Sequence, residues 1–161
     1  MTLRSVGESN LPNIRSNVNK LLKDAAADED VRVLAVDIVA NSEGPKDPII
    51  AICNWMRNNV AYVPDPVNAE LFTAPGRMAR DHYNGKQLGE DCDGIAIMTT
   101  ALARAVGIPC NVVLLDQTGS GYDHAVCEIT DEKTGTILMV DNSSTDVPVG
   151  WHEKYAKKVV L

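Results

Sequence analysis

The sequence predicts an α+β domain, and three observations lead to that conclusion. Apolar residues at helical spacing fill most of the first sixty positions. One further helical pattern begins beside a cysteine and ends at a Gly-Ile-Pro turn. Strand-like segments joined by glycine-bearing turns follow it. Helices followed by consecutive strands are typical of a helical layer packed on a small antiparallel sheet.

Three helices are expected in the first part of the chain, because apolar residues recur there at three- and four-residue steps. The acidic stretch 28–30 suits the start of the second helix, since negative charge is favourable at a helix N-terminus. Pro48 fits the first turn of the third. The expected ranges are 13–27, 30–40 and 47–59.

The connection 61–89 is predicted to be irregular, because prolines and glycines interrupt every pattern in it. An amphipathic helix is expected next, over 93–106, and Gly107 and Pro109 end it. The residues expected to face inward are Ile95, Met98, Leu102, Ala105 and Val106.

The last elements predicted are three strands, over 110–115, 124–130 and 136–140, because these segments are β-branched or alternating. A flexible loop over 116–123 joins the first two, and a tight turn over 131–135 joins the last two. The strands therefore form an antiparallel sheet. The lysines near the end, Lys154, Lys157 and Lys158, are interpreted as a solvated terminus.

Length and composition indicate a single domain over 1–161, with residues 1–12 loosely ordered. The net charge of -7 argues against nucleic-acid binding, which needs clustered lysine and arginine. No apolar run reaches the ~20 residues that would span a membrane, and the start lacks the apolar stretch of a secretory signal. We therefore expect a cytoplasmic protein. The oligomeric state cannot be inferred.

The four cysteines are expected to be reduced in that compartment. They include no C-x-x-C pair, so the sequence predicts no metal site and no cofactor. Cys92 alone stands at the start of a predicted helix, where unpaired N–H groups and the helix dipole favour a thiolate. Its neighbours Asp91 and Asp93 oppose that charge, unless they cap the helix. The other cysteines lie within predicted helices or strands: Cys53, Cys110 and Cys127.

His124 begins one predicted strand, and Asp141 ends the next. Antiparallel neighbours joined by a short turn bring these two positions to one edge of the sheet. If the start of the Cys92 helix packs against that edge, a thiol, a base and an orienting carboxylate meet there. On spacing alone, a histidine at a strand start is more often a surface or packing residue than a base, and an aspartate before Asn142-Ser143-Ser144 is more often a turn former.

These segments resemble the core of the transglutaminase-like superfamily. The stretch GEDCDGIA (89–96) is similar to its cysteine-bearing helix start, and LARAVGIP (102–109) to the turn that ends that helix. HAVCEI (124–129) resembles the histidine strand, and MVD (139–141) the aspartate strand end.

Upstream, ICNWMRNNVAYVPDP (52–66) and NAELFTAP (68–75) are similar to transglutaminase-like proteins of phages and prophages. The resemblance covers about 28–145. Two departures are visible. Val126 replaces an aromatic residue of the histidine strand, and the approach to Cys92 is one residue longer than in the phage pattern.

The resemblance implies a papain-like fold and a thiol enzyme that attacks peptide or protein amides through an acyl-thioester. Cys92 would be the nucleophile, His124 the base and Asp141 the group that orients it. Hydrolysis is favoured over cross-linking, because the size suits protease-like relatives and no calcium loop is visible. For the second oxyanion donor or the substrate pocket, the candidates are Gln87, Trp55, Tyr62 and Asp93.

The competing hypothesis is a catalytically inactive protein of the same fold, used for interaction or assembly by a phage or prophage. The acidic flank of Cys92 and the altered approach loop motivate it. A phage-encoded protein would act in the host cytoplasm.

Overall fold

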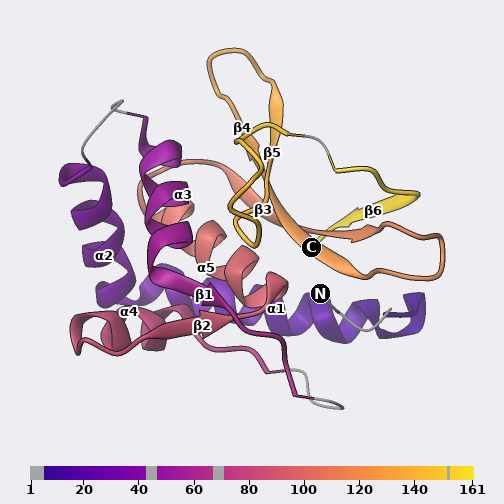
Figure 1. Ribbon diagram of the computed structural model, residues 1–161, viewed down its shortest axis with the longest axis horizontal. Helices are drawn as coiled ribbons and strands as arrows, with labels where there is room; N and C mark the ends of the chain where they lie inside the picture. The colour runs from indigo at the N-terminus through magenta and orange to yellow at the C-terminus, as the bar shows by residue number, and fades with distance from the viewer. Residues whose placement is uncertain (1–5, 43–46, 67–70, 152) are drawn as a thin grey trace.

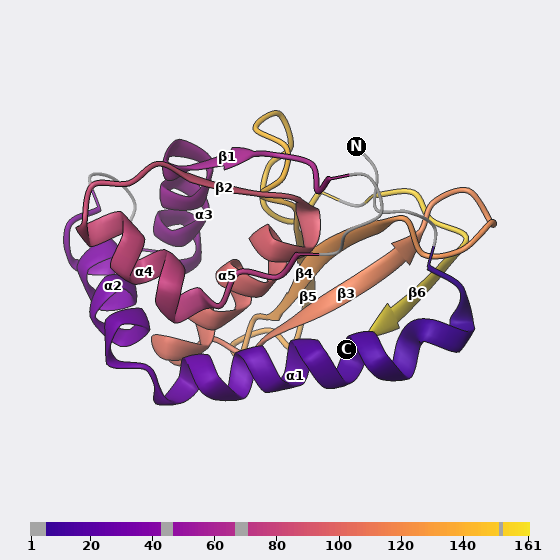
Figure 2. The same ribbon diagram turned by 90° about the horizontal axis from the view of Figure 1, so that it is seen from below.

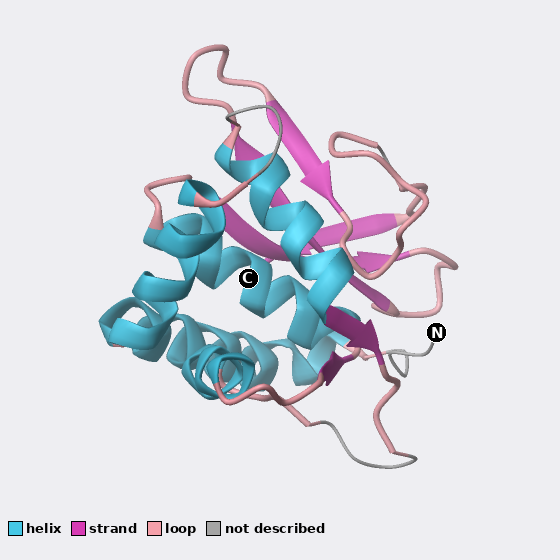
Figure 3. Cartoon of the chain, turned by 60° about the vertical axis from the view of Figure 1, so that its left-hand side comes forward, coloured by secondary structure: helices cyan, strands magenta, loops and turns pink. Residues whose placement is uncertain are grey.

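The computed structural model describes residues 6–42, 47–66, 71–151 and 153–161, and these form the predicted α+β architecture. Most helices lie on one side of the central helix over 92–105 and a four-stranded sheet on the other, whereas a second, two-stranded sheet lies on the helical side (Figures 1 and 3). The helices are η1 (Glu8–Asn10), α1 (Leu11–Ala27), α2 (Glu29–Ala40), α3 (Pro48–Asn59), α4 (Pro75–Tyr83) and α5 (Cys92–Ala105). The strands are β1 (Val60–Tyr62), β2 (Leu88–Glu90), β3 (Cys110–Asp116), β4 (His124–Thr130), β5 (Ile137–Val140) and β6 (Lys157–Val160).

Helix α5 is the centre of the fold, and the prediction of a single inward face on it is wrong. It contacts α1, α2 and α3 as well as β3 and β4, and every residue from Cys92 to Ala103 is buried. Helix α1 runs beneath both α5 and the sheet (Figure 2). Two of the predicted inward residues, Ala105 and Val106, are only half-buried, because the helix leaves the core at that end.

The four-stranded sheet has the order β5-β4-β3-β6, with antiparallel pairing throughout. The three predicted strands are confirmed, and β4 has the predicted bounds. The fourth strand, β6, was not predicted, although its lysines are exposed, as expected of a solvated end. Lys158 pairs with Leu115 of β3, and its ammonium group lies 2.5 Å from Glu128 of β4. The sequence of β6, two lysines followed by two valines, does not alternate between polar and apolar residues, so it gave no strand signal.

The connection 61–89 is more regular than predicted. Within it, α4 begins at Pro75, and β1 and β2 pair in parallel with Tyr62 opposite Glu90. Both strands have three residues, too few for an alternating pattern to register. The two strands are almost thirty positions apart in the chain, so a pattern within either segment could not predict their pairing. Part of this connection, 67–70, lies outside the described residues.

In the described part of the N-terminal segment, Val6 is docked against the loop that precedes β4, whereas residues 7–10 are exposed. Val6 is 8% exposed and exchanges two backbone hydrogen bonds with Tyr122, of 2.8 and 3.2 Å. Helix α1 begins at Leu11, two residues earlier than predicted, with Pro12 in its first turn. Residues 1–5 lie outside the described part. Across the described residues, no helix is long and apolar enough to span a bilayer.

Candidate active site

Cys92 is the first residue of α5, and its position follows from how that helix is capped. The preceding Asp91 has extended backbone angles, and its carboxylate accepts a hydrogen bond of 3.4 Å from the Gly94 N–H. This is the arrangement expected of an aspartate N-cap. The N–H groups of the first turn have no acceptors within the helix. The sulfur therefore lies at the positive end of the helix dipole, although Cys92 is only 1% exposed.

The structure brings His124 and Asp141 together at one edge of the sheet. His124 opens β4, Asp141 follows β5, and His124 Nε2 lies 2.8 Å from Asp141 Oδ2. Both residues are 7% exposed. A hydrogen bond between these atoms places the imidazole N–H on Nε2, because a carboxylate only accepts.

The carboxylate of Asp141 is itself held in place. Its Oδ1 accepts hydrogen bonds from the Ser143 backbone N–H, at 2.9 Å, and from the Ser143 hydroxyl, at 2.6 Å. Arg57 of α3 donates to the Asp141 carbonyl at 3.1 Å and to the Val147 carbonyl at 2.6 Å. These contacts fix both the carboxylate and the loop behind it, so the imidazole has a rigid partner.

Cys92 meets this edge of the sheet at the residue after the histidine. The backbone of Ala125 forms a hydrogen bond with the Cys92 thiol. The second ring nitrogen of His124, Nδ1, is buried and has no hydrogen-bond partner among the described residues. The thiol and an imidazole nitrogen without a proton donor therefore lie at the same strand start.

Burial raises the pKa of the Cys92 thiol well above its ordinary value. The hydrogen bond from Ala125 opposes that shift, whereas the carboxylates of Asp93, Asp91 and Asp141 add to it. For Asp141, burial acts to raise the pKa, but the hydrogen bonds from His124 and Ser143 outweigh it, so its pKa is lowered. The resting site thus pairs a neutral thiol with an ionised orienting carboxylate.

The altered approach to Cys92 has a structural cause, which the sequence analysis missed. Glu90 is 8% exposed, and burial raises the pKa of its carboxyl group although Thr73 donates to it. A Cβ atom at position 94 would collide with this carboxyl group. Gly94 therefore leaves room for Glu90 against the first turn of α5. The signal in the sequence was a glycine inside a helix, where glycine is otherwise unfavourable.

Of the predicted pocket residues outside α5, Tyr62 lies close to the start of that helix, because it is paired with Glu90, two residues before Cys92. Its hydroxyl group is buried. Gln87 is exposed and precedes β2, so that strand separates it from the helix start, and the structure does not bring it to Cys92. Asp93 is buried and lines a small apolar space below α5, together with Val18 of α1.

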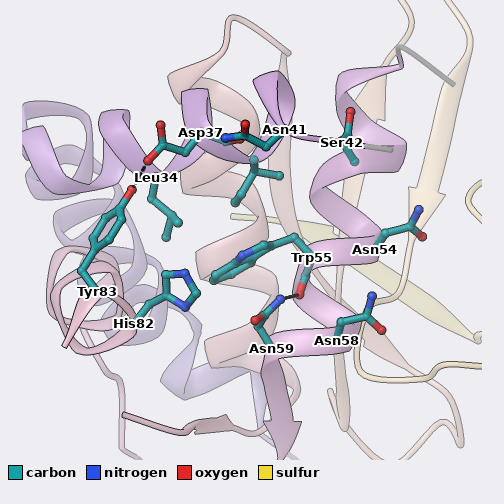
Figure 4. Close-up of a pocket in the computed structure, with 12 residues that line it drawn as sticks. Leu34, Asp37, Asn41, Ser42, Asn54, Trp55, Asn58, Asn59, His82 and Tyr83 are labelled. Carbon is teal, nitrogen blue, oxygen red and sulfur yellow. Dashed lines mark hydrogen bonds between the residues drawn. The ribbon is translucent and has the colours of Figure 1, made fainter. Parts of the chain in front are cut away.

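Trp55 lies in a different place, a cleft of about 480 Å³ between α2, α3 and α4. Its ring meets that of His82 edge-on, with centroids 5.0 Å apart (Figure 4). On the far side of the cleft, Tyr83 donates to Asp37 at 2.6 Å (Figure 4). No residue of the Cys92, His124 and Asp141 set lines this cleft. The structure therefore separates Trp55 from the nucleophile.

One further residue lies at the candidate site without any signal in the sequence. Glu153 places a carboxylate oxygen within 4.8 Å of a ring nitrogen of His124 and of a carboxylate oxygen of Asp141. It lies in the irregular segment between β5 and β6, where no periodicity fixes the direction of a side chain.

The profile of the transglutaminase-like superfamily matches residues 32–140, which is more than half of the chain. The chain belongs to the transglutaminase-like superfamily. Its match includes Cys92, His124 and the end of β5 just before Asp141. No curated protein sequence matches the chain.

Solved structures with this fold come from several bacteria. A proposed cysteine protease from Cytophaga hutchinsonii superposes with a TM-score of 0.50 at 23% identity, over 70% of this chain and 36% of that one. A proposed protease from Parabacteroides distasonis gives 0.56 at 15% identity, over 81% and 29%. Calcium-bound LapG from Legionella pneumophila gives 0.52 at 18% identity, over 86% and 76%. The chain thus spans about a third of the first two proteins, and at these identities the likeness shows the fold.

Proposed function

We propose that this chain is a thiol-dependent amide hydrolase, with Cys92 as nucleophile, His124 as general base and Asp141 as the residue that orients His124. The observation that supports this most is the bond between His124 Nε2 and Asp141, since it leaves Nδ1 to act as the proton acceptor at the strand start that Cys92 meets. The cysteine-protease-like neighbours are consistent with a peptide or protein substrate.

In the proposed reaction, His124 Nδ1 takes the thiol proton while the Cys92 sulfur attacks the amide carbonyl carbon. The tetrahedral oxyanion is stabilised by the Cys92 backbone N–H, with the Tyr62 hydroxyl as the second donor. His124 then returns its proton to the departing nitrogen, and an acyl-thioester remains on Cys92. Water attacks that thioester, His124 accepts its proton, and the carboxylic acid leaves as the thiol is restored. If an amine attacked the thioester in place of water, the acyl group would be transferred to that amine.

The pKa values explain why the base is needed. Burial and three carboxylates keep the thiol neutral at rest, so the sulfur becomes an anion only as its proton moves to His124. The proton acquired by the imidazole is compensated by Asp141, which is already ionised.

Labelling with iodoacetamide at neutral pH, followed by mass mapping, tests the proposal. Cys92 should react faster than the other three cysteines of the same chain, which act as internal controls and are also buried. Substituting His124→Ala should remove that advantage. Equal reactivity of all four thiols in the folded protein would disprove nucleophilic activation.

A second candidate function is favoured by the low exposure and raised pKa of Cys92. It is a catalytically inactive interaction or assembly protein that retains the fold, encoded by a phage or prophage. Activity-based profiling separates the two candidates, because only the enzyme loses signal specifically in the Cys92→Ala variant. We propose a single domain over 1–161 that acts in the cytoplasm, that of the host if a phage encodes it, without binding nucleic acid or membrane.

A further inference from the structure

Glu153 contributes a carboxylate to the candidate site that the proposed mechanism does not use. Its oxygen lies within 4.8 Å of the His124 ring and the Asp141 carboxylate. Over the described parts of the chain, Glu153 forms no ion pair, and its sequence neighbour Lys154 is exposed and forms none either. A half-buried carboxylate therefore stands beside the imidazole without a cation.

Three other cations of the chain are engaged elsewhere. Lys157 pairs with Glu8, and Lys158 pairs with Glu128 on β4. Arg57 donates to backbone carbonyls of the loop behind Asp141. The negative charge of Glu153 near His124 is therefore not balanced by any of these three cations.

Two carboxylates near the Cys92 sulfur have structural duties, whereas Glu153, close to His124, has no hydrogen bond or ion pair among the described residues. Asp91 caps α5 and Asp141 holds His124. His124 Nδ1, buried and without a hydrogen-bond partner among the described residues, marks where the reacting group must arrive. The Glu153 carboxylate thus lies within 4.8 Å of the imidazole that would act on the substrate amide.

We propose that Glu153 is a specificity-determining residue, which selects substrates carrying a cationic group, such as a lysine or arginine side chain, beside the amide that is cleaved. This inference rests on the proposed function. A partly desolvated carboxylate attracts a nearby cation more strongly than an exposed one does, and it repels an anion by a similar amount. The net charge of -7 adds a long-range attraction of the same sign.

Three thiol reagents that share one reactive group and differ in the charge of the group they transfer test this without a known substrate. They are the methanethiosulfonates with trimethylammonioethyl, ethyl and sulfonatoethyl groups. In each case the Cys92 thiolate attacks the sulfenyl sulfur, a mixed disulfide forms, and methanesulfinate leaves. Rates at Cys92 are followed by mass mapping and divided by the rates with free N-acetylcysteinamide, which removes the intrinsic reactivity of each reagent.

The corrected cation-to-anion rate ratio should exceed one in the wild-type protein. In Glu153→Gln it should fall about tenfold, because one charge at this range contributes on the order of that factor to the difference between opposite charges. Glu153→Asp should restore most of the ratio. The matched control is Glu132→Gln, an exposed glutamate in the turn between β4 and β5, which should leave the ratio unchanged. Added salt should reduce the wild-type ratio.

The alternatives give different results. If Glu153→Gln changes all three rates equally, Glu153 acts on His124 and does not select charge, and the proposal is overturned. If the cation-to-anion rate ratio exceeds one only when EDTA is present, then His124, Asp141 and Glu153 bind a divalent ion. That result also overturns the proposal. If Cys92 reacts with none of the reagents while the folded protein remains intact, the proposed function itself fails, and this inference fails with it.

Discussion

Buried sulfur atoms lie at two places along helix α5, and their neighbours differ. At its first residue, Cys92 meets the start of β4, where a buried ring nitrogen of His124 has no hydrogen-bond partner among the described residues. About two turns later, Thr100 Oγ1 lies 3.5 Å from the sulfur of Cys110 and 3.4 Å from that of Cys127. Cys127 also donates to the Ala96 carbonyl at 3.2 Å.

Burial does not distinguish the two places, because burial raises the pKa of Cys92 and of Cys127 alike. The difference lies in the neighbours. The middle of α5 offers a hydroxyl and a carbonyl, which hold a thiol in place but do not remove its proton. The first turn offers an imidazole with an ionised partner. The predictions below test whether that difference is functional.

The largest effect should come from Cys92→Ala, which should reduce amide hydrolysis at least about 10³-fold, since loss of the nucleophile leaves only binding and oxyanion contacts. The measurement is turnover of a fluorogenic peptide library that includes lysine- and arginine-containing members. Cys53→Ala, which removes another buried sulfur, is the matched control and should keep activity. Comparable activity in both variants would contradict the assignment.

Asp141→Asn should slow the alkylation of Cys92 about 10²- to 10⁴-fold, because an amide can turn its N–H toward Nε2 and favour the wrong tautomer of His124. The rate at Cys127 should not change. Asp131→Asn, on an exposed turn, serves as the control. A uniform change at Cys92 and Cys127 would point to loosening of the fold and not to loss of orientation.

Gly94→Ala should destabilise the protein by about 2 kcal/mol, because the added methyl group collides with the buried Glu90 carboxyl group. Glu90 cannot easily move, since Thr73 holds it. Urea unfolding gives the free energy. Gly7→Ala is the control, because its nearest neighbour would be 3.7 Å away. The double variant Glu90→Ala, Gly94→Ala should recover most of the loss; failure to recover would locate the strain elsewhere.

Two carboxylates near the first turn should give opposite dependence of stability on pH. Burial raises the pKa of Glu90, so the folded state binds its proton more tightly, and stability should fall as pH rises above the unfolded value of about 4.3. Asp141 has a lowered pKa, so its contribution is present above about pH 3.9 and is lost as pH falls through the folded value.

Unfolding free energies between pH 3 and pH 7 measure both effects. Glu90→Gln should remove the decrease toward neutral pH, and Asp141→Asn should weaken the loss at acidic pH. Each shift should be on the order of 1 kcal/mol. If both variants changed the pH dependence of stability in the same direction, the pKa values of Glu90 and Asp141 would not be shifted in opposite directions.

The smallest effect is expected in the middle of α5. Thr100→Val removes the hydroxyl group between Cys110 and Cys127 and should cost about 1 kcal/mol of stability. The labelling rate of Cys92 should remain unchanged. If labelling of Cys92 slows as much as in Asp141→Asn, the two sulfur environments are not independent, and the contrast between them is lost.

Local patterns were sufficient for most elements. The apolar spacing of α1, α2 and α3 and the alternation of β4 appear within single stretches of sequence, as does the Gly-Ile-Pro end of α5. The order of Cys92, His124 and Asp141 pointed to the edge where the last two meet. The elements that were missed, β1, β2 and β6, are short, and each is held by a partner distant in the chain.

The sequence by itself determined the fold class, the family and the residues to compare, because periodicity and turn chemistry act over a few neighbouring positions. Only the tertiary structure decided the environment of each one. It separated Trp55 from the nucleophile, placed Glu90 over Gly94, and brought Glu153 to His124. These placements depend on how strands and helices far apart in the chain pack, and no local pattern encodes the direction of a side chain in an irregular segment.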